Sequence, residues 1–343
     1  KEQPLDERTG EEIERLAAVT DEGWEDLANA YADVLGLPGI EPATQAVIVK
    51  RLARVFEEEL QDVEKAEETY RYVLSVAARD AEALANLDRI YSSLEQWSDL
   101  AGVLEQRAVV APDSTEQVEL YTRLGQVYEE RLGQVDDSVR SFRRIFDDLD
   151  PANEEAIRSL ARIYELKEAW VDLKGVYERQ LQNAVGDVEE AEIRARMARL
   201  AADRLGNVSE SVEGWKRVLD LRGEDPEALW ALADLYERQE RWAELTDVLE
   251  RHFDIADSDE ERVNILTRRA NLFLERLGRD DEALETWQRV LDIDFANVNA
   301  LRAMAHIWRT RKDPQELVTV LHMTIDRAGP ALEPRDLVEV YRE

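Results

Sequence analysis

Residues 242–245, Trp242-Ala243-Glu244-Leu245, open a pattern that recurs along the whole chain. Its counterparts, at a nearly constant interval, are Trp24-Glu25-Asp26-Leu27, Trp97-Ser98-Asp99-Leu100, Trp170-Val171-Asp172-Leu173 and Pro314-Gln315-Glu316-Leu317. Such regular self-similarity indicates tandem structural repeats, and an array of repeats grows by addition and not by enlarging one core. We therefore predict one continuous array over residues 1–343. Its repeats start near residues 8, 80, 153, 225 and 297, and the last repeat is truncated.

Each repeat predicts four helices, and the repeat that starts near residue 225 shows the signals clearly. Pro226 falls at a first helical position, and apolar residues then recur at helical spacing. The third helix ends at Arg276-Leu277-Gly278, and Arg131-Leu132-Gly133 and Arg204-Leu205-Gly206 repeat this ending. Glycine after a helix adopts the left-handed conformation at little cost. Gln61 replaces the glycine in the first repeat, so we expect a turn of different shape there.

The fourth helices carry the most specific pattern, a small residue followed by an aromatic one. The pairs are Ala66 and Tyr70, Ser138 and Phe142, Ser211 and Trp215, and Ala283 and Trp287. A small residue lets two helices approach closely, and the aromatic side chain then fills the space between them. We expect these aromatic residues to be buried, together with the tryptophans that begin the second helices. For those tryptophans a ligand-stacking role is the alternative.

These patterns resemble tetratricopeptide repeats. The first helices carry a leucine, a Leu-Ala pair three residues on and then a tyrosine, as in Leu229, Leu232-Ala233 and Tyr236. The resemblance covers nearly the whole chain, although bulkier Leu173 and Leu245 occupy small-residue positions of the family motif. It implies an all-α, right-handed superhelical solenoid of about 18 helices stacked as antiparallel pairs. The half-a-tetratricopeptide variety is the second choice and implies the same architecture.

The chain is strongly acidic, with 77 acidic and 44 basic residues among 343 and a formal net charge of −33. This charge argues against nucleic-acid binding and favours solvated outer faces, with attraction of a basic partner as the second interpretation. The chain has no cysteine, which excludes disulfides and thiolate chemistry. No apolar run approaches the roughly 20 residues of a membrane span. We expect a cytoplasmic protein, or a periplasmic one if a signal peptide has been removed.

No motif for catalysis or cofactor binding occurs. The histidines are His252, His306 and His322, and none forms a His-Glu-x-x-His pair with another. Glycine-rich nucleotide loops and the Gly-x-Ser-x-Gly elbow are absent. Adjacent acids such as Asp280-Asp281 point different ways on a helix, so they cap turns and form no acid/base dyad. We expect no enzyme activity, no cofactor and no metal.

The resemblance also implies a binding surface, because in this family the first helix of each pair faces a concave groove. The candidate partner-binding residues at the inward positions are Lys50, Arg54, Arg89, Arg158, Arg162, Arg199, Trp230, Asn271, Arg302 and His306. Seven of the 16 inward positions hold Lys or Arg and one is acidic, which predicts a comparatively basic groove suited to an acidic segment or a C-terminal carboxylate. Local pairing is the competing interpretation, since Glu57, Glu129 and Glu237 follow inward positions at salt-bridge spacing.

We therefore expect a non-catalytic scaffold that binds a peptide or helix of a partner protein in its concave groove. A chaperone co-factor role is not expected, because Thr267 stands where the family's Lys-and-Asn clamp needs a lysine beside Asn271. One alternative is a structural spacer that assembles with its own copies through open ends. The other is the regulatory arm of a larger enzyme. The predicted last helix, residues 335–343, leaves an apolar stripe uncovered, which indicates a segment of a longer protein.

Overall fold

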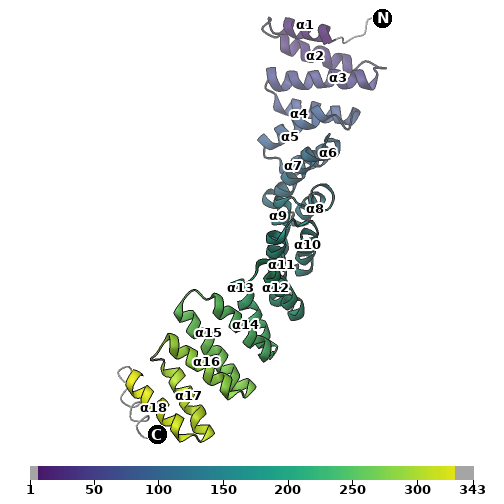
Figure 1. The fold of residues 1–343 in the computed structure, drawn as a ribbon. Coiled ribbons are helices and arrows are strands. Elements are labelled where there is room, and N and C mark those ends of the chain that lie inside the picture. The colour runs from purple at the N-terminus through teal and green to yellow at the C-terminus, as the bar shows by residue number, and fades with distance from the viewer. Residues whose placement is uncertain (1–6, 329–343) are drawn as a thin grey trace. The chain divides into compact units, whose positions relative to one another are not determined.

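The computed structural model describes residues 7–328, and the secondary structure in that range is helical throughout, without a β-strand (Figure 1). The predicted all-α repeat architecture with antiparallel helix pairs is confirmed, and the described range contains 18 α-helices. The helix predicted at residues 335–343 lies outside the described residues.

The bounds of the helices follow the predicted four-helix repeats. The α-helices are α1 (Glu7–Ala17), α2 (Gly23–Leu35), α3 (Pro42–Arg54), α4 (Val63–Val76), α5 (Ala81–Ser93), α6 (Trp97–Val110), α7 (Ser114–Gln126), α8 (Val135–Arg144), α9 (Glu154–Leu166), α10 (Trp170–Asn183), α11 (Asp187–Asp203), α12 (Val208–Arg222), α13 (Pro226–Arg238), α14 (Trp242–Ile255), α15 (Asp259–Leu272), α16 (Asp280–Ile293), α17 (Val298–Arg311) and α18 (Pro314–Met323). Short π-helical turns extend five of them, namely η1 (Val55–Glu59), η2 (Val127–Arg131), η3 (Ile145–Leu149), η4 (Phe273–Leu277) and η5 (Thr324–Ala328).

The chain divides into two compact units, Lys1–Val176 and Tyr177–Glu343. In the first unit, one apolar cluster joins α3 to α7 and a smaller one joins α1, α2 and α3. In the second unit, one cluster joins α11 to α15 and another continues from α15 to α18. Within each unit the apolar side of a helix is therefore covered by its neighbours along the chain. The single continuous array over residues 1–343 stays a prediction.

Side-chain caps fix where the first helix begins in the four repeats that start near residues 80, 153, 225 and 297. Asp80, Asn153, Asp225 and Asn297 each accept a hydrogen bond of 2.9–3.0 Å from the backbone N–H three residues further on. Such a cap satisfies a backbone donor that the helix leaves without an intrahelical partner, and replacing it with alanine costs about 1 kcal/mol. The caps recur once in each of these repeats, so they set the same starting point in successive repeats.

The turns after the third helices confirm the role of the repeated glycines. Gly133, Gly206 and Gly278 have φ angles of 64°, 64° and 63°. The expectation of a different turn at Gln61 was wrong, because Gln61 takes the same left-handed conformation with φ 52°. The N–H of the next residue, Asp62, donates to the Phe56 carbonyl at 2.8 Å. The other three turns close with the equivalent hydrogen bond, so this closure imposes a conformation that costs a non-glycine residue about 1–2 kcal/mol.

The aromatic residues of the fourth helices are buried as predicted. Tyr70, Phe142, Trp215 and Trp287 are each at most 2% exposed. Phe142 shows how close the approach is, because a Cβ atom added to Gly125 of α7 would lie 2.7 Å from its ring. The glycine is therefore required for α7 and α8 to pack at this distance.

The tryptophans that begin the second helices, which the sequence predicted to be buried between helices, are partly buried, less so than the aromatic residues of the fourth helices. Trp97 and Trp242 pack against the apolar clusters on one side. The guanidinium groups of Arg131 and Arg276 lie 4.8 and 5.2 Å from their ring centroids. The arginines of the Arg-Leu-Gly endings at Arg131 and Arg276 thus place a cation over the indole. Only the glycine of these endings was assigned a role from the sequence.

Candidate functional site

The predicted groove residues lie on odd-numbered helices. Lys50 and Arg54 are in α3, Arg89 in α5, Arg158 and Arg162 in α9, Arg199 in α11, Trp230 in α13, Asn271 in α15, and Arg302 and His306 in α17. Arg302 and His306 are exposed, and Asn271 is partly buried.

Most of the basic groove residues with a described ion pair reach a neighbouring odd-numbered helix or the π-helical turn that extends it. Arg162 donates to Glu129 of η2 at 2.5 and 2.8 Å, and Arg89 pairs with Glu57 of η1. Lys50 lies 3.1 Å from both Asp80 and Glu82. Arg54 and Arg199 likewise pair with Glu82 of α5 and Glu227 of α13, whereas Arg158 pairs with Glu155 in its own helix.

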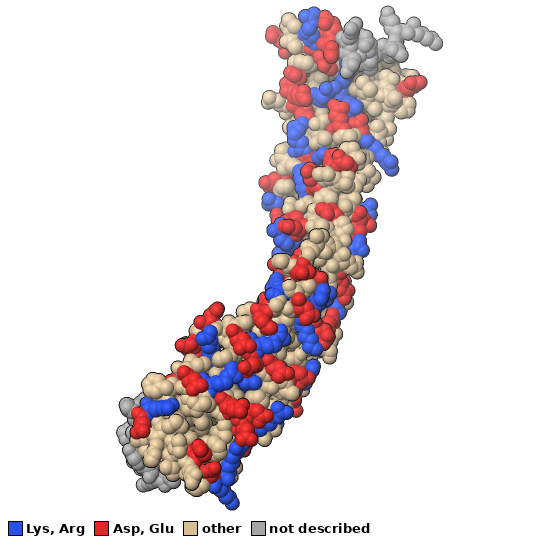
Figure 2. Space-filling view, in the orientation of Figure 1, with Lys and Arg blue, Asp and Glu red and all other residues tan. Residues whose placement is uncertain are grey.

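The competing interpretation expected these acids to form ion pairs with residues of their own helices. The acids do form ion pairs, but their partners belong to other helices. Glu57 and Glu129 were expected to pair within their own helices, but both accept from arginines of other helices, Arg89 and Arg162. Glu237 behaves in the same way and pairs with Arg268 of α15. Figure 2 shows the result, with Lys and Arg side chains beside Asp and Glu across the visible face. The basic groove residues with a described ion pair are thus already paired with acids.

One carboxylate of the first unit is held in a buried cluster of three helices. Asp88 of α5 is 3% exposed and pairs with Arg107 of α6. Arg123 of α7 donates to Asp88 Oδ2 at 2.8 Å and to the Ser92 hydroxyl at 2.7 Å, and its guanidinium lies 2.7 Å from Asp88 Oδ1. Sequence reasoning missed this residue. Its signal is the alignment of the repeats, since the first helices of the later repeats have alanine at this position, as in Ala233.

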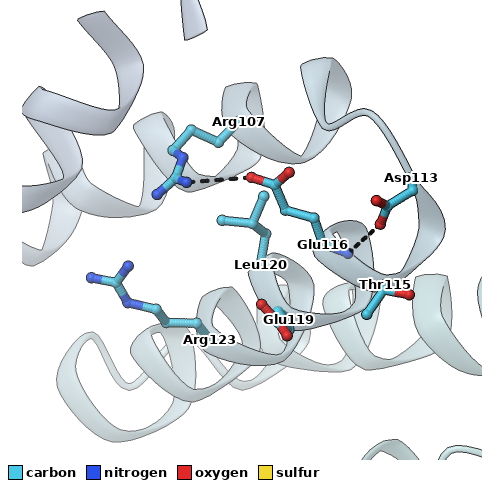
Figure 3. A pocket seen from close by; sticks show the side chains of 7 residues that line it. All are labelled: Arg107, Asp113, Thr115, Glu116, Glu119, Leu120 and Arg123. Atoms are coloured by element: carbon cyan, nitrogen blue, oxygen red, sulfur yellow. Dashed lines mark hydrogen bonds and ion pairs between the residues drawn. The ribbon is translucent and has the colours of Figure 1, made fainter. Parts of the chain in front are cut away.

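A cavity of about 470 Å³ opens beside this cluster, and we call it the first pocket. Its lining residues are Arg107, Asp113, Thr115, Glu116, Glu119, Leu120 and Arg123 (Figure 3). Arg107 reaches from α6 toward Glu116, at 3.5 Å, while Arg123 and Leu120 come from α7. Asp113 caps α7 by accepting from the Glu116 N–H at 2.9 Å. The pocket is polar and is lined by charges of both signs.

A second pocket of about 310 Å³ lies in the second unit, among α13, α14 and α15. Its lining residues are Trp230, Leu249, His252, Ser258, Glu260, Glu261, Asn264, Ile265 and Arg268. Trp230 is 56% exposed, whereas His252 is 3% exposed. The two rings meet edge to face, with centroids 5.8 Å apart and an interplanar angle of 74°. Of the predicted groove residues, Trp230 alone lines either pocket.

The two pockets occupy the same place in the repeat. Each lining residue of the first pocket has a counterpart two repeats further on that lines the second pocket. Arg107 thus corresponds to His252, Leu120 to Ile265 and Arg123 to Arg268. The backbone frame is shared, and the side chains that fill it differ.

Two further observations concern the described part of the chain. Residues 7–328 contain no group of three or more histidines or acids arranged to hold a metal ion. None of the helices in that range has both the length and the apolar character needed to cross a lipid bilayer.

Comparisons with known proteins point to one repeat family. The family model for the tetratricopeptide repeat matches residues 83–118 and 228–263, and these two stretches are also offset by two repeats. No curated protein matches the chain.

Several solved structures resemble parts of the chain at low sequence identity. The C-terminal part of a TPR repeat-containing protein from Cytophaga hutchinsonii is 12% identical, with a TM-score of 0.39 over 74% of this chain and 98% of that one. YrrB, described as a TPR protein with an unusual peptide-binding site, is 14% identical, with a TM-score of 0.36 over 55% and 96%. The Pseudomonas aeruginosa protein pilF is 12% identical, with a TM-score of 0.33 over 67% and 99%. The family model thus identifies tetratricopeptide repeats at residues 83–118 and 228–263, within a chain whose described residues form helical pairs.

Proposed function

We propose that this protein is a scaffold that binds a segment of a partner protein along its odd-numbered helices, and that each pocket receives side chains of a bound segment. The observation that carries the proposal is the recurrence of one pocket at the same repeat position in both compact units. Stacked helical repeats form extended surfaces that are used for binding. Cavities of about 300–1,000 Å³ are the size in which ligand groups are bound.

The differences between the pockets support a binding role over a by-product of helix packing. One apolar lining position is shared, since Leu120 of the first pocket corresponds to Ile265 of the second. The residues that line the rest of the pocket change in charge and in aromatic character, as Arg107 and His252 show. Such a change alters what a pocket can recognise while its frame stays the same.

Binding of an acidic segment, the finer expectation from the sequence, stays a prediction. An acidic segment would compete with Glu129 for Arg162 and with Glu155 for Arg158. The double variant Arg158→Glu/Arg162→Glu tests this point, because a partner held by those two arginines would lose affinity. Unchanged affinity of selected peptides for that variant would remove the acidic-segment version and leave the pocket version intact.

A peptide display library selected on the full chain tests the pocket version. Glu119→Trp and Asn264→Trp fill the first and second pockets at equivalent exposed positions. Ser98→Trp and Ala243→Trp are the matched controls, since both are exposed, lie on the second helices and line neither pocket. We expect each filled pocket to weaken its selected peptides at least about tenfold, which corresponds to about 1.4 kcal/mol.

Circular dichroism of each variant shows whether the fold is retained. If peptides selected on the wild-type chain bind both pocket-filling variants as tightly as the controls, the pockets are not the binding sites and the proposal is wrong.

A further inference from the structure

Three of the differences between the two units lie in the pockets or beside them. Ala85 is replaced by Trp230, Asp88 by Ala233 and Arg107 by His252, each two repeats further on. In the first unit these positions hold a buried carboxylate and an arginine that pairs with it. In the second unit they hold an indole and an imidazole in edge-to-face contact. The exchange removes a buried ion pair and leaves aromatic surface in its place.

The walls of the second pocket favour an apolar or aromatic group. Leu249 and Ile265 are almost fully buried, and the His252 ring, which also lines the pocket, meets the Trp230 ring edge to face. Burial lowers the pKa of His252 below its ordinary value of 6.5, so this imidazole adds no positive charge near pH 7. Trp230 is more than half exposed in the free protein. Covering an exposed indole that stands beside an apolar floor is favourable.

The mouth of the second pocket is acidic. Glu260 and Glu261 line the pocket, and Glu261 lies 3.4 Å from the His252 imidazole. The exposed Asp257 and Asp259 precede them in the chain, and Asp259 pairs with Arg262. The one lining arginine, Arg268, is in an ion pair with Glu237 of α13. The carboxylates therefore outnumber the positive charges at the mouth, in line with the net charge of −33 on the whole chain. Such a rim attracts basic residues of a partner.

The position of Arg268 decides where those basic residues bind. Its guanidinium lies 5.8 Å from the centroid of the Trp230 ring. A second cation placed on the same indole would be repelled by it, whereas a neutral aromatic ring would not. An aromatic ring also prefers the edge-to-face and offset contacts that the indole and imidazole offer. The cations of the partner therefore belong at the carboxylates of the mouth and its aromatic ring belongs inside.

We propose that the second pocket binds an aromatic side chain of a partner protein that is flanked by lysine or arginine residues. This inference rests on the proposed scaffold function and names the chemistry of one of its two sites. The first pocket offers no counterpart to this aromatic wall, because alanine stands at the position of the indole and Arg107 at the position of the imidazole. The same segment is therefore expected to discriminate between the two units.

Three fluorescein-labelled peptides test the inference by anisotropy titration of the full chain. The first has phenylalanine between two pairs of lysines, the second replaces phenylalanine with alanine, and the third replaces the lysines with glutamates. We expect the first peptide to bind at least about tenfold more tightly than either of the others, as for an interface with one dominant aromatic residue. The alanine peptide measures the attraction that comes from charge alone.

Protein variants locate the binding. Trp230→Ala should bring the phenylalanine peptide to the affinity of the alanine peptide. Phe295→Ala, which removes another exposed aromatic residue of the second unit, should leave it unchanged. Glu260→Gln/Glu261→Gln should weaken binding several-fold and reduce its dependence on salt. The indole N–H signal of Trp230, assigned by its loss in Trp230→Phe, should shift on addition of the phenylalanine peptide.

Equal affinity for the phenylalanine and alanine peptides, or tighter binding of the glutamate peptide, would overturn the inference. The scaffold proposal has its own readout in the selected peptides. If Asn264→Trp abolishes their binding while the lysine-flanked phenylalanine peptide fails, the pocket binds a different chemistry and only this inference is lost. If Asn264→Trp changes neither the binding of the selected peptides nor that of the lysine-flanked phenylalanine peptide, both proposals fail at this pocket.

Discussion

Replacing Asp88 with alanine tests whether the buried ion cluster stabilises the first unit. Truncating one partner of a fully buried ion pair costs about 3–5 kcal/mol, because the remaining charge is left in a poorly hydrated site. Here the remaining charges are Arg107 and Arg123, whose side chains are 23% and 42% exposed and so reach water. We therefore expect a smaller loss of about 2 kcal/mol for Asp88→Ala.

Hydrogen exchange followed by mass spectrometry of the full chain measures this loss locally. A loss of about 2 kcal/mol corresponds to roughly 30-fold faster exchange of the slowest amides in α5, α6 and α7. Peptides from the second unit serve as an internal reference and should not change. Glu105→Ala, an exposed substitution on α6, is the matched control and should leave exchange unaltered.

The double variant Asp88→Ala/Arg107→His reproduces the arrangement of Ala233 and His252 in the second unit. The substitution also removes a guanidinium that has lost its closer partner and keeps only Glu116, at 3.5 Å. We therefore expect the double variant to be about 1 kcal/mol more stable than Asp88→Ala alone. Unchanged exchange in the single variant would show that the cluster contributes nothing to stability. Additive losses in the double variant would show that Asp88 and Arg107 are not coupled, which would refute the reasoning.

Three further substitutions test the packing, a turn and a titrating group, each by denaturant or thermal unfolding. Gly125→Ala should destabilise the first unit by about 1–2 kcal/mol, because the new Cβ would lie 2.7 Å from the buried ring of Phe142. Glu240→Gly should stabilise the second unit by about 0.5–1 kcal/mol, because residue 240 has a φ of 55° that glycine adopts without strain. Burial lowers the pKa of His252 in the folded chain, so on acidification the unfolded chain binds a proton first. The free energy of unfolding should therefore fall as the pH drops below 6.5 and through the folded-state pKa. His252→Phe should remove this pH dependence.

Matched control variants show whether each change in stability comes from the named contact, turn or histidine and not from the substitution itself. Gly102→Ala, in a helix where an added Cβ meets no atom within 4 Å, should be stabilising, and a loss there equal to that of Gly125→Ala would refute the packing argument. Gly206→Ala, with φ 64°, should be destabilising; a gain would contradict the argument about left-handed turns. His306 is exposed, so His306→Phe should leave the acid sensitivity in place.

The repeat pattern predicted the helices well because the signals are local. The small and aromatic residues of the fourth helices, such as Ala283 and Trp287, lie one helical turn apart and face the same neighbour. The caps are equally local, since Asp225 binds a backbone donor three residues away. Gln61 shows the limit of this reasoning. Its left-handed conformation follows from closure of the turn and not from its own preference.

The candidate site was predicted less well because its contacts join different helices. The acceptor of Arg162 is Glu129 of an earlier helix, and spacing along one helix cannot reveal such a pair. The pockets depend on more than one helix, so no single motif marks them. Aligning the chain with itself at an offset of two repeats would have shown the change from Asp88 to Ala233. It would not have shown that the change opens aromatic surface beside Trp230.

Ion pairs that join successive odd-numbered helices make the elasticity of each unit depend on ionic strength. The pairs are Arg89 with Glu57, Arg162 with Glu129, Arg199 with Glu227 and Arg268 with Glu237. Bending a unit so that these helices separate stretches the pairs, while the apolar contacts between adjacent helices change little. Salt screens exposed charges and leaves apolar contacts in place. Each unit is therefore stiffer in dilute buffer than in concentrated salt. For a partner that bends the unit on binding, the free-energy cost of bending is lower at high salt.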